Sequence, residues 1–377
     1  MPGPLLGVRI LELPAIGPVP FLGALLSDLG AEVVRVDRLR DPGIFGMFPS
    51  GPLGRGRRSI GLDLRKPGGT EVVLRLAETC DALIEGFRPG VMERLGIGPD
   101  EVLARNPKLV YGRMTGWGQE GPLASTAGHD INYLALTGLL HGIGPKDRPW
   151  PPANYVADFG GGSMFLALGL LAGILHARST GEGQVVDVAM TEGAAYLGAM
   201  TRTFVSMGGW QDERDANLLD GGAPNYRCYE TSDGKFMAVG AIEPQFWAAL
   251  VGAIGREVDT TPSPYDPAQW EACAALLTEV FATKTREEWA AIFAPLDACV
   301  APVLTLAEAP AHPHNVARGS FVTVGDATLA APAPKFSATP GETLGLTEML
   351  AAGPALLAEL GYSAAEVEEL RTAGTIS

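Results

Sequence analysis

Three residues of this chain carry side chains that transfer protons and stand in settings where they could do chemistry. His129 lies in the run Gly-His-Asp-Ile-Asn-Tyr at residues 128–133. Asp158 comes shortly before three glycines and a long apolar run, and Glu243 follows an apolar segment and precedes Pro244. Histidine and carboxylate side chains are the usual general acids and bases of enzymes. The sequence therefore offers one base and two acids, far apart along the chain.

Each of these residues also has a structural interpretation. An isolated histidine is commonly a hydrogen-bonded structural side chain, although Gly128 would leave room for a ligand beside His129. An aspartate before a helix is a favoured N-cap, and the same geometry would expose amides that stabilise an oxyanion. Glu243 before a proline fits the first turn of a helix. Spacing alone leaves both interpretations open.

The charge of the chain is unevenly distributed. The 377 residues carry a formal net charge of −15, which disfavours binding to nucleic acid or anionic lipid. The stretch from Arg35 to Lys66 has the opposite balance. We call its eight cations the basic island: Arg35, Arg38, Arg40, Arg55, Arg57, Arg58, Arg65 and Lys66, with only Asp37, Asp41 and Asp63 as acids. Such an island indicates either an anionic small ligand or a solvated basic face.

Other features disfavour several classes of protein. The four cysteines lack metal-type spacing, so we expect no zinc site or disulfide framework, in keeping with a reducing cytoplasm. The N-terminus lacks the basic and apolar segments of a secretory signal. The apolar run Met164 to Leu175 is shorter than the about 20 residues that span a bilayer. We therefore expect a cytoplasmic protein without a metal or a membrane span.

Alternating apolar segments predict the elements that would position these residues. Strands are expected at residues 7–13, 32–36, 82–85, 109–113 and 184–190, with helices at 21–30, 68–80, 99–106 and 160–177. This alternation predicts an α/β fold with a Rossmann-like parallel sheet that helices cover on both faces. No GxGxxG run follows the first strand, so the dinucleotide-binding fingerprint is missing.

A change in composition predicts two domains. The large Rossmann-like domain is expected at residues 1–195, a linker at 196–224, a smaller α+β domain at 225–306 and a proline-rich return linker at 307–340, after which 341–377 rejoin the large domain. The small domain begins with a hairpin pattern at 226–242, and helical periodicity follows at 244–254, 266–283 and 285–293.

Taken together in order, these motifs resemble those of the α-methylacyl-CoA racemases, members of the family III CoA-transferase superfamily. The resemblance covers residues 5–340 and rests on eight runs: 33–38, Asp63-Leu64, 90–96, 113–119, 128–133, 157–159, 219–224 and 239–246. It implies a large and a small domain in an interlocked homodimer whose active sites lie between chains. It also implies an acyl-CoA substrate, no separate cofactor, and a reaction of lipid metabolism.

The resemblance further implies roles for individual residues. His129, supported by Glu243, and Asp158 would move the α-proton of the thioester on opposite faces. The Asp158 amide and the region 160–162 would hold the enolate oxygen. The coenzyme A site would comprise Arg38, Leu62, Asp63, Leu64, Arg65, Gly86, Phe87, Arg88 and Arg94 at the adenosine phosphates, and Gly128, Asp130, Ile131, Asn132 and Tyr133 facing the thioester.

Three positions depart from the pattern of the family. Arg65 stands where a lysine is usual, which should keep a phosphate contact but alter its geometry. Tyr155 replaces a typical aliphatic residue, and Asn225 stands where relatives usually have an aromatic one. The last two are expected to bear on acyl-chain specificity.

Three functions can be considered for this chain, and the presence of all three proton-handling residues counts against the last of them. A racemase would interconvert (2R)- and (2S)-2-methylacyl-CoA through an enolate. A family III CoA-transferase would instead use Asp158 as a nucleophile and form an acyl-enzyme anhydride. A noncatalytic CoA-binding protein would keep the arginines without the three proton-handling residues. Because a transferase needs no His/Glu pair, His129 and Glu243 favour the racemase.

Overall fold

The computed structural model describes residues 3–39, 51–346 and 350–377, so Arg40 and Asp41 lie outside the described residues. The chain divides into two compact units. The first comprises residues 1–137, 153–197 and 313–377, and the second comprises 138–152 and 198–312. Residues 313–340, which the sequence assigns to a return linker, thus cluster with the first unit, and 198–224 cluster with the second.

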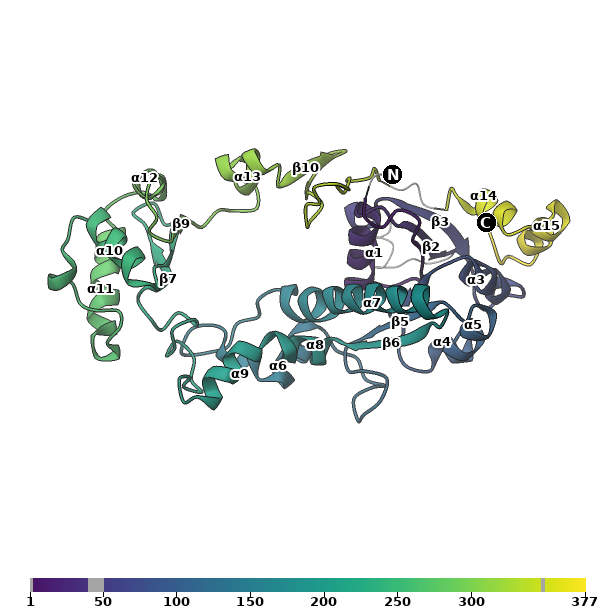
Figure 1. Cartoon of the computed structure of the whole chain (residues 1–377), viewed down its shortest axis with the longest axis horizontal. Coiled ribbons are helices and arrows are strands. Elements are labelled where there is room, and N and C mark those ends of the chain that lie inside the picture. Colours follow the sequence, from purple (N-terminus) through teal and green to yellow (C-terminus); the bar gives the residue numbers. More distant parts are fainter. Residues whose placement is uncertain (1–2, 40–50, 347–349) are drawn as a thin grey trace. The chain divides into compact units, whose positions relative to one another are not determined.

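A six-stranded parallel sheet forms the centre of the first unit (Figure 1). Its strands are β1 (Arg9–Glu12), β2 (Glu32–Arg38), β3 (Arg57–Leu62), β4 (Ala82–Glu85), β5 (Val110–Thr115) and β6 (Gln184–Ala189), in the order β3-β2-β1-β4-β5-β6. The order reverses between β1 and β4, and ligands of such open sheets bind at the carboxyl ends beside the reversal. The predicted α/β class with a parallel sheet is confirmed. β3 was not predicted, because its sequence begins with two arginines.

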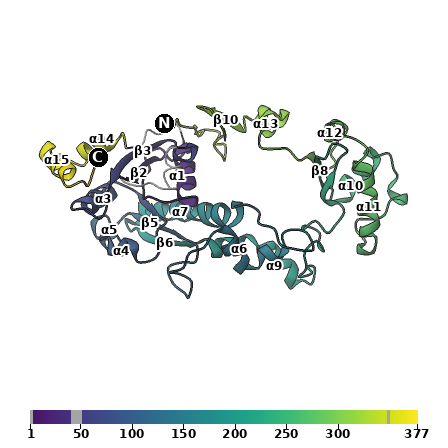
Figure 2. The same cartoon turned by 180° about the vertical axis from the view of Figure 1, so that it is seen from behind.

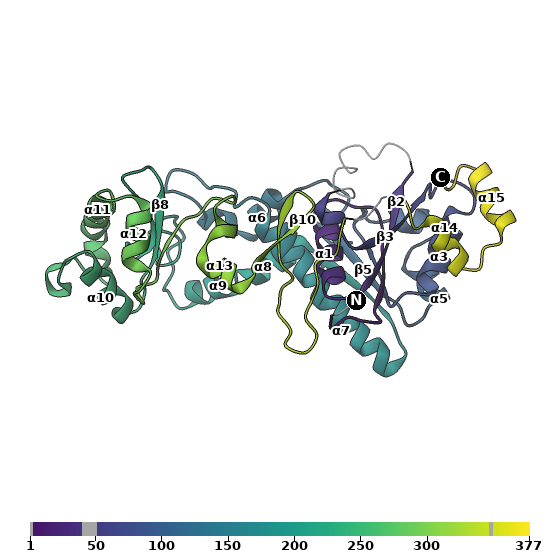
Figure 3. The same cartoon turned by 90° about the horizontal axis from the view of Figure 1, so that it is seen from above.

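Helices cover both faces of this sheet (Figure 3). On one face lie α1 (Pro18–Asp28) and α7 (Met164–Thr180); on the other lie α3 (Gly69–Glu78), α4 (Val91–Arg94), α5 (Pro99–Arg105), α14 (Gly353–Glu359) and α15 (Ala364–Thr372). Because side chains alternate along a strand, Leu11, Val34 and Ile60 join the apolar core on the second face. There they pack with Leu76 of α3 and Leu356 of α14.

Beneath α1 the sheet carries buried charges. Arg57 Nε donates to Glu12 Oε2 at 3.0 Å, and both side chains are at most 1% exposed. Arg35 and Asp37 form a second buried ion pair at 2.9 Å. Gly23 of α1 packs on the first pair and leaves no room there for a Cβ. These contacts fix the position of α1 on the sheet.

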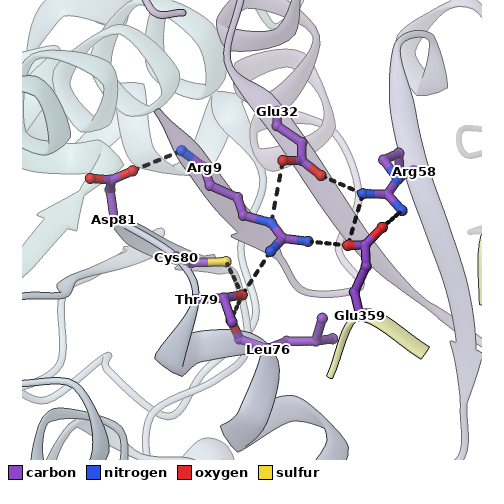
Figure 4. Close-up of polar contacts among 8 residues, drawn as sticks. All are labelled: Arg9, Glu32, Arg58, Leu76, Thr79, Cys80, Asp81 and Glu359. Atoms are coloured by element: carbon purple, nitrogen blue, oxygen red, sulfur yellow. Dashed lines mark hydrogen bonds and ion pairs between the residues drawn. The ribbon is translucent and has the colours of Figure 1, made fainter. Parts of the chain in front are cut away.

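A surface ion-pair network joins the C-terminal part of the chain to the start of the sheet (Figure 4). Arg9 on β1 pairs with Glu32 on β2 at 3.4 Å and with Glu359 on α14 at 3.1 Å. Arg58 on β3 reaches the same two acids, at 2.6 Å in the case of Glu32. Figure 2 shows α14 beside β3. The network therefore ties three strands to one C-terminal helix.

The last residues of the chain are buried against the loop that follows β3. The carbonyl oxygen of Thr375 accepts the Asp63 N–H at 2.9 Å. The Thr375 hydroxyl donates to the Pro67 carbonyl at 2.8 Å, and Ile376 belongs to the apolar core. Chain termini are ordinarily poorly ordered unless they are tied down in this way.

Further elements of the first unit are α6 (Asp130–Thr137), the π-helix η4 (Tyr155–Ser163), α8 (Met190–Leu197), α13 (Pro313–Arg318) and the hairpin β10 (Phe321–Val324) and β11 (Ala327–Ala330). Among them, η4 packs on α7 and on α8. Together η4 and α7 make one helix, Tyr155–Thr180, that is long and apolar enough to cross a membrane by length and composition. Gly169 and Gly173 bring it against Val186 and Val110 of the sheet. These contacts are those of a core helix.

The second unit contains an antiparallel sheet with helices packed on it. Its strands are β7 (Tyr226–Glu230), β8 (Phe236–Gly240) and β9 (Val300–Pro302). Its helices are α9 (Ala199–Ser206), α10 (Pro244–Ala253), α11 (Trp270–Phe281) and α12 (Arg286–Phe293). Its core gathers Trp247, Phe281 and Trp289. The hairpin predicted at 226–242 is confirmed, and β9 is too short to show a strand pattern.

Replacing Ile376 by alanine should loosen the loop after β3. The change removes buried apolar contacts and should cost about 2 kcal/mol or more. Because Asp63 N–H is bonded to the neighbouring Thr375, hydrogen exchange measured by mass spectrometry should speed up in residues 62–67. Ser377→Ala, at an exposed position, is the matched control. Unchanged exchange in the Ile376 variant would contradict the anchoring role.

Candidate active site

Residues that we expected to bind coenzyme A gather at the carboxyl edge of the parallel sheet. Arg38 ends β2 and Leu62 ends β3, and the two are paired in register. Gly86 follows β4, where a Cβ would come within 3.3 Å of Ala15 in the loop after β1. Because all six strands are parallel, these ends lie along one edge of the sheet, and Gly86 lies at the reversal in strand order between β1 and β4. Their binding role itself remains a prediction.

Much of the basic island is neutralised within the fold. The ion pairs are Arg35–Asp37, Arg55–Asp28, Arg57–Glu12 and Arg58 with Glu32 and Glu359. Most of these acids come from outside the stretch 35–66, so a local count of charges missed them. The interpretation of the basic island as a single anion-binding surface is therefore wrong. Among its described members, Arg38, Arg65 and Lys66 are exposed, and Arg65 pairs with Asp63 at 3.2 Å.

A buried ion pair anchors the loop after β4. Glu85 accepts from Arg113 Nε at 3.0 Å with one oxygen and from the Phe87 N–H at 2.7 Å with the other. Arg113 also donates to Glu93 of α4 at 2.8 Å. Burial raises the pKa of Glu85 to about 7 despite the neighbouring arginine. The sequence analysis missed Glu85, although an acid that ends an apolar strand was a visible signal.

His129 lies on an exposed turn where α6 begins. Its N–H donates to Asn132 Oδ1 at 3.1 Å, and its carbonyl accepts the Asn132 N–H at 2.8 Å. The side chain is exposed. In the part of the chain that the structure describes, no hydrogen bond holds the imidazole. The backbone of His129 is therefore fixed while its ring remains available to a ligand.

Gly128 does not leave room for a ligand, contrary to our expectation. A Cβ at this position would lie 2.6 Å from the Tyr133 ring and 2.9 Å from the Trp117 ring. These two rings meet edge to face with centroids 4.9 Å apart, and the Tyr133 hydroxyl donates to the Gly128 carbonyl. Tyr133, which we expected to face the thioester, is thus a buried packing residue. Ile131 is 42% exposed, and Asn132 is exposed.

Asp158 lies inside the π-helix η4 and does not cap a helix, so the N-cap interpretation is wrong. π-Helical turns are rare and are often found at functional sites. Its Oδ2 accepts from Asn154 Nδ2 at 3.3 Å. The side chain is half-buried, and this burial raises the pKa of the carboxyl group; the Asp130 charge adds to the rise, and the Asn154 bond and the His129 charge oppose it. His129 and Asp158 are therefore within electrostatic reach of each other.

The Asp158 amide is already bonded within the protein. Its N–H donates to Asp130 Oδ1 at 2.7 Å, and the Ala157 N–H donates to the same oxygen at 2.7 Å. Gly161, in the glycine run after Asp158, is buried against the Ala194 backbone of α8. In this arrangement the Asp158 amide is therefore not free to hold the enolate oxygen, and Gly161 is packed inside the chain; the expected role of Gly160 and Gly162 stays a prediction. Asp130, expected to contact the ligand, is only 4% exposed.

Glu243 belongs to the second unit, whereas His129 and Asp158 belong to the first. It occupies the N-cap position of α10 and is followed by Pro244, as the sequence predicts, but its carboxylate makes no capping hydrogen bond. The side chain is exposed.

Asn225, one of the departures from the family pattern, is fully buried, and its side-chain amide donates to the Ala241 carbonyl, two residues before Glu243, at 2.9 Å. Tyr155, the other, is 65% exposed.

No group of three or more His, Cys, Asp or Glu side chains in the described residues could hold a metal ion. The site geometry consists instead of an exposed imidazole, a half-buried carboxyl group and an edge of the sheet with exposed cations.

A family model, CoA-transferase family III, matches residues 5–355. The chain belongs to this family. The resemblance that the eight motifs indicated is thus confirmed.

Relatives within CoA-transferase family III are similar over most of the chain. The α-methylacyl-CoA racemases of Mus musculus and Homo sapiens are 48% and 45% identical to it over 336 residues, which cover 89% of this chain and 87% of each relative. Among solved structures, a CAIB/BAIF family protein from Brucella suis is similar with a TM-score of 0.81 and 25% identity. That match covers 96% of this chain and 100% of the other.

Replacing Glu85 by glutamine should change how the stability of this family member depends on pH. The pKa of Glu85 is raised in the folded state to about 7 from an ordinary 4.5. The folded chain therefore binds this proton more tightly than the unfolded chain, and the associated stability is lost as pH rises through that range. At about 1.4 kcal/mol per pKa unit, wild type should lose about 2–3 kcal/mol relative to Glu85→Gln between pH 4.5 and 7.

Thermal or urea unfolding across this pH range would measure the difference. Glu101→Gln, at an exposed position on α5, is the control and should show a nearly constant difference from wild type. A wild type that gains stability over Glu85→Gln as the pH rises would contradict the raised pKa.

Proposed function

We propose that this chain is an α-methylacyl-CoA racemase, which interconverts (2R)- and (2S)-2-methylacyl-CoA by removing and returning the α-proton. The observation that carries the proposal is the pair His129 and Asp158. An exposed imidazole that has no hydrogen-bond partner among the described residues lies within electrostatic reach of a half-buried carboxyl group whose pKa is raised by burial. The imidazole suits the role of base, and burial moves the pKa of the Asp158 carboxyl group upward, which is the direction that favours a general acid. Relatives that are 48% and 45% identical carry this name.

The proposed mechanism gives each of these two groups one face of the substrate. His129 takes the α-proton from one face, and the negative charge that develops spreads onto the thioester oxygen. Asp158 then returns a proton to the opposite face, and the reverse reaction exchanges the two roles. Glu243 would stabilise the imidazolium that forms on His129. The thioester itself makes the α-proton acidic, so the proposed reaction uses no cofactor.

Coenzyme A would bind along the carboxyl edge of the sheet. Arg38, Arg65, Arg88 and Arg94 are exposed, and all except Arg94 end a strand or follow one closely; Arg94 ends α4, which the Glu93–Arg113 pair ties to β5. Guanidinium groups bind phosphate oxygens in charge-assisted hydrogen bonds. We therefore assign the adenosine phosphates to these arginines, with the loops 62–65 and 86–88 around them. This use of 2-methylacyl thioesters would place the reaction in cytoplasmic lipid metabolism.

We further propose a homodimer in which Glu243 of one chain completes the site formed by His129 and Asp158 of the other. The support is apolar surface that a single chain leaves exposed. On α7, Met164, Leu168 and Leu175 are 48%, 66% and 71% exposed and recur at helical spacing. The helix α9 has no buried residue, although it carries several large apolar side chains. Several large apolar side chains left exposed on one helix are typical of subunit interfaces.

Asp158→Asn separates the racemase from the CoA-transferase that the family name also allows. In a racemase the carboxyl group only moves a proton, so the variant should lose epimer interconversion. Wild type in deuterated water should incorporate deuterium at the α-carbon from either epimer, without an acceptor acid. The variant should keep exchange from the one epimer that His129 serves, because each base acts on its own face. Mass spectrometry and chiral chromatography measure both quantities.

The transferase gives the opposite pattern in the same samples. There Asp158 would be acylated, so hydroxylamine would trap an acyl adduct in wild type and none in Asp158→Asn. CoA would move to a second acid with the α-hydrogen retained. That outcome would replace the racemase by the transferase.

Mixing two inactive variants tests the shared site. His129→Ala and Glu243→Ala should each be strongly impaired alone. If each site takes one residue from each chain, a mixed dimer contains one intact site and one doubly altered site. Random re-association should then restore about a quarter of wild-type activity. A fully active monomer in light scattering, or no recovery in isolated mixed dimers, would contradict the shared site.

A further inference from the structure

Asp130 is a buried carboxylate that the proposed proton transfers do not use. It begins α6 and is 4% exposed. Its Oδ1 accepts two hydrogen bonds of 2.7 Å, from the successive amides of Ala157 and Asp158. These residues lie in the first turn of η4, about 28 positions further along the chain. One oxygen of Asp130 thus holds the backbone that carries the proposed acid.

The helix η4 needs this outside partner. Amides in the first turn of a helix have no acceptor within the helix and require a cap. The residue in the N-cap position, Asn154, makes no capping hydrogen bond. Its side-chain amide instead donates to the Asp158 carboxyl group at 3.3 Å. Asp130 therefore supplies from α6 the acceptor that the N-terminus of η4 lacks.

The charge of Asp130 also acts on Asp158, because the second carboxylate oxygen of Asp130 is buried. Within the described residues, Oδ2 is buried and has no hydrogen-bond partner, so the negative charge is screened only weakly. Burial is the largest cause of the raised pKa of Asp158, and the Asp130 charge acts in the same direction. The positive charge of His129 acts against it.

The other titratable groups around η4 do not have this effect. On the elements packed against η4 they are Asp28 on α1, Tyr133 on α6, His176 and Arg178 on α7, Glu192 and Tyr196 on α8, Tyr111 and Arg113 on β5, and Asp187 on β6, with Tyr155 on η4 itself. Among the described residues, none of these shifts the pKa of Asp158. Asp130 is therefore the acid whose removal should change the pKa of Asp158.

We propose that Asp130 is a positioning residue for proton transfer at Asp158: its Oδ1 holds the two amides of the turn that bears Asp158, and its buried carboxylate places a charge beside that acid. The proposal rests on the proposed function, because it takes Asp158 to be a proton donor. It gives Asp130 a role that differs from the ligand contact implied by the family resemblance. The two parts of the role, geometry and charge, can be separated by two substitutions.

Asp130→Asn keeps an oxygen that can accept both amides but removes the charge. Racemisation by this variant should keep its KM, while its pH–rate profile moves to lower pH, because a nearby like charge raises the pKa of an acid. Asp130→Ala removes the acceptor too. Its kcat should fall about tenfold or more with a small change in KM, because a misplaced catalytic group loses rate rather than binding.

Glu192→Gln is the matched control. It removes a negative charge from α8, another helix that packs on η4, at an exposed position. Its pH profile should coincide with that of wild type. Circular dichroism and thermal melting check that all three variants fold; if Asp130→Ala does not, the pH shift of Asp130→Asn alone decides the question.

Hydrogen exchange separates failure of this proposal from failure of the proposed function. The amides of residues 157 and 158 should exchange faster in Asp130→Ala than in wild type, whatever reaction the enzyme catalyses. Unchanged exchange together with an unchanged pH profile of Asp130→Asn would overturn the positioning role. A raised KM with unchanged kcat in Asp130→Ala would also overturn it and make Asp130 a ligand contact. If the wild-type enzyme incorporated no deuterium at the α-carbon, the proposed racemase function would instead be contradicted.

Discussion

A charge that is taken out of water must meet an opposite charge or several hydrogen bonds, and this constraint fixes the segments around the carboxyl edge of the sheet. On one face, Arg57 and Glu12 hold α1 in place. On the other, Glu85 and Arg113 hold the loop after β4. Near the proposed acid, Asp130 meets two amides of η4. Each buried charge therefore secures one segment that borders the site.

The same constraint explains where sequence analysis of the fold succeeded and failed. The strands β1, β2 and β4 could be predicted, because their burial comes from apolar residues whose pattern is local. The strand β3 could not, because Arg57 and Arg58 at its start are paired with acids elsewhere in the chain. The basic island misled for the same reason. From the sequence alone a cation is predicted to be exposed, because the acid that neutralises it in the fold is not known.

For the candidate site, residue types could be predicted but surroundings could not. His129, Asp158 and Glu243 stood out as groups that transfer protons, and the family resemblance joined them. Sequence spacing does not distinguish a π-helix from an α-helix, so the setting of Asp158 was missed. Nor does it show that Asp130 turns inward to the amides of η4. Such roles depend on contacts between segments that are distant in the sequence.

The burial of the C-terminus has a consequence for how the protein is made. The loop after β3, proposed to bind the phosphates of coenzyme A, shares its hydrogen bonds with Thr375, which lies 308 positions beyond Pro67. A ribosome makes Thr375 after every strand of the sheet. The loop after β3 therefore gains this hydrogen-bond partner only after all six strands have been synthesised. In a growing chain, the loop at the carboxyl edge of β3 lacks these hydrogen bonds until residue 375 has been made.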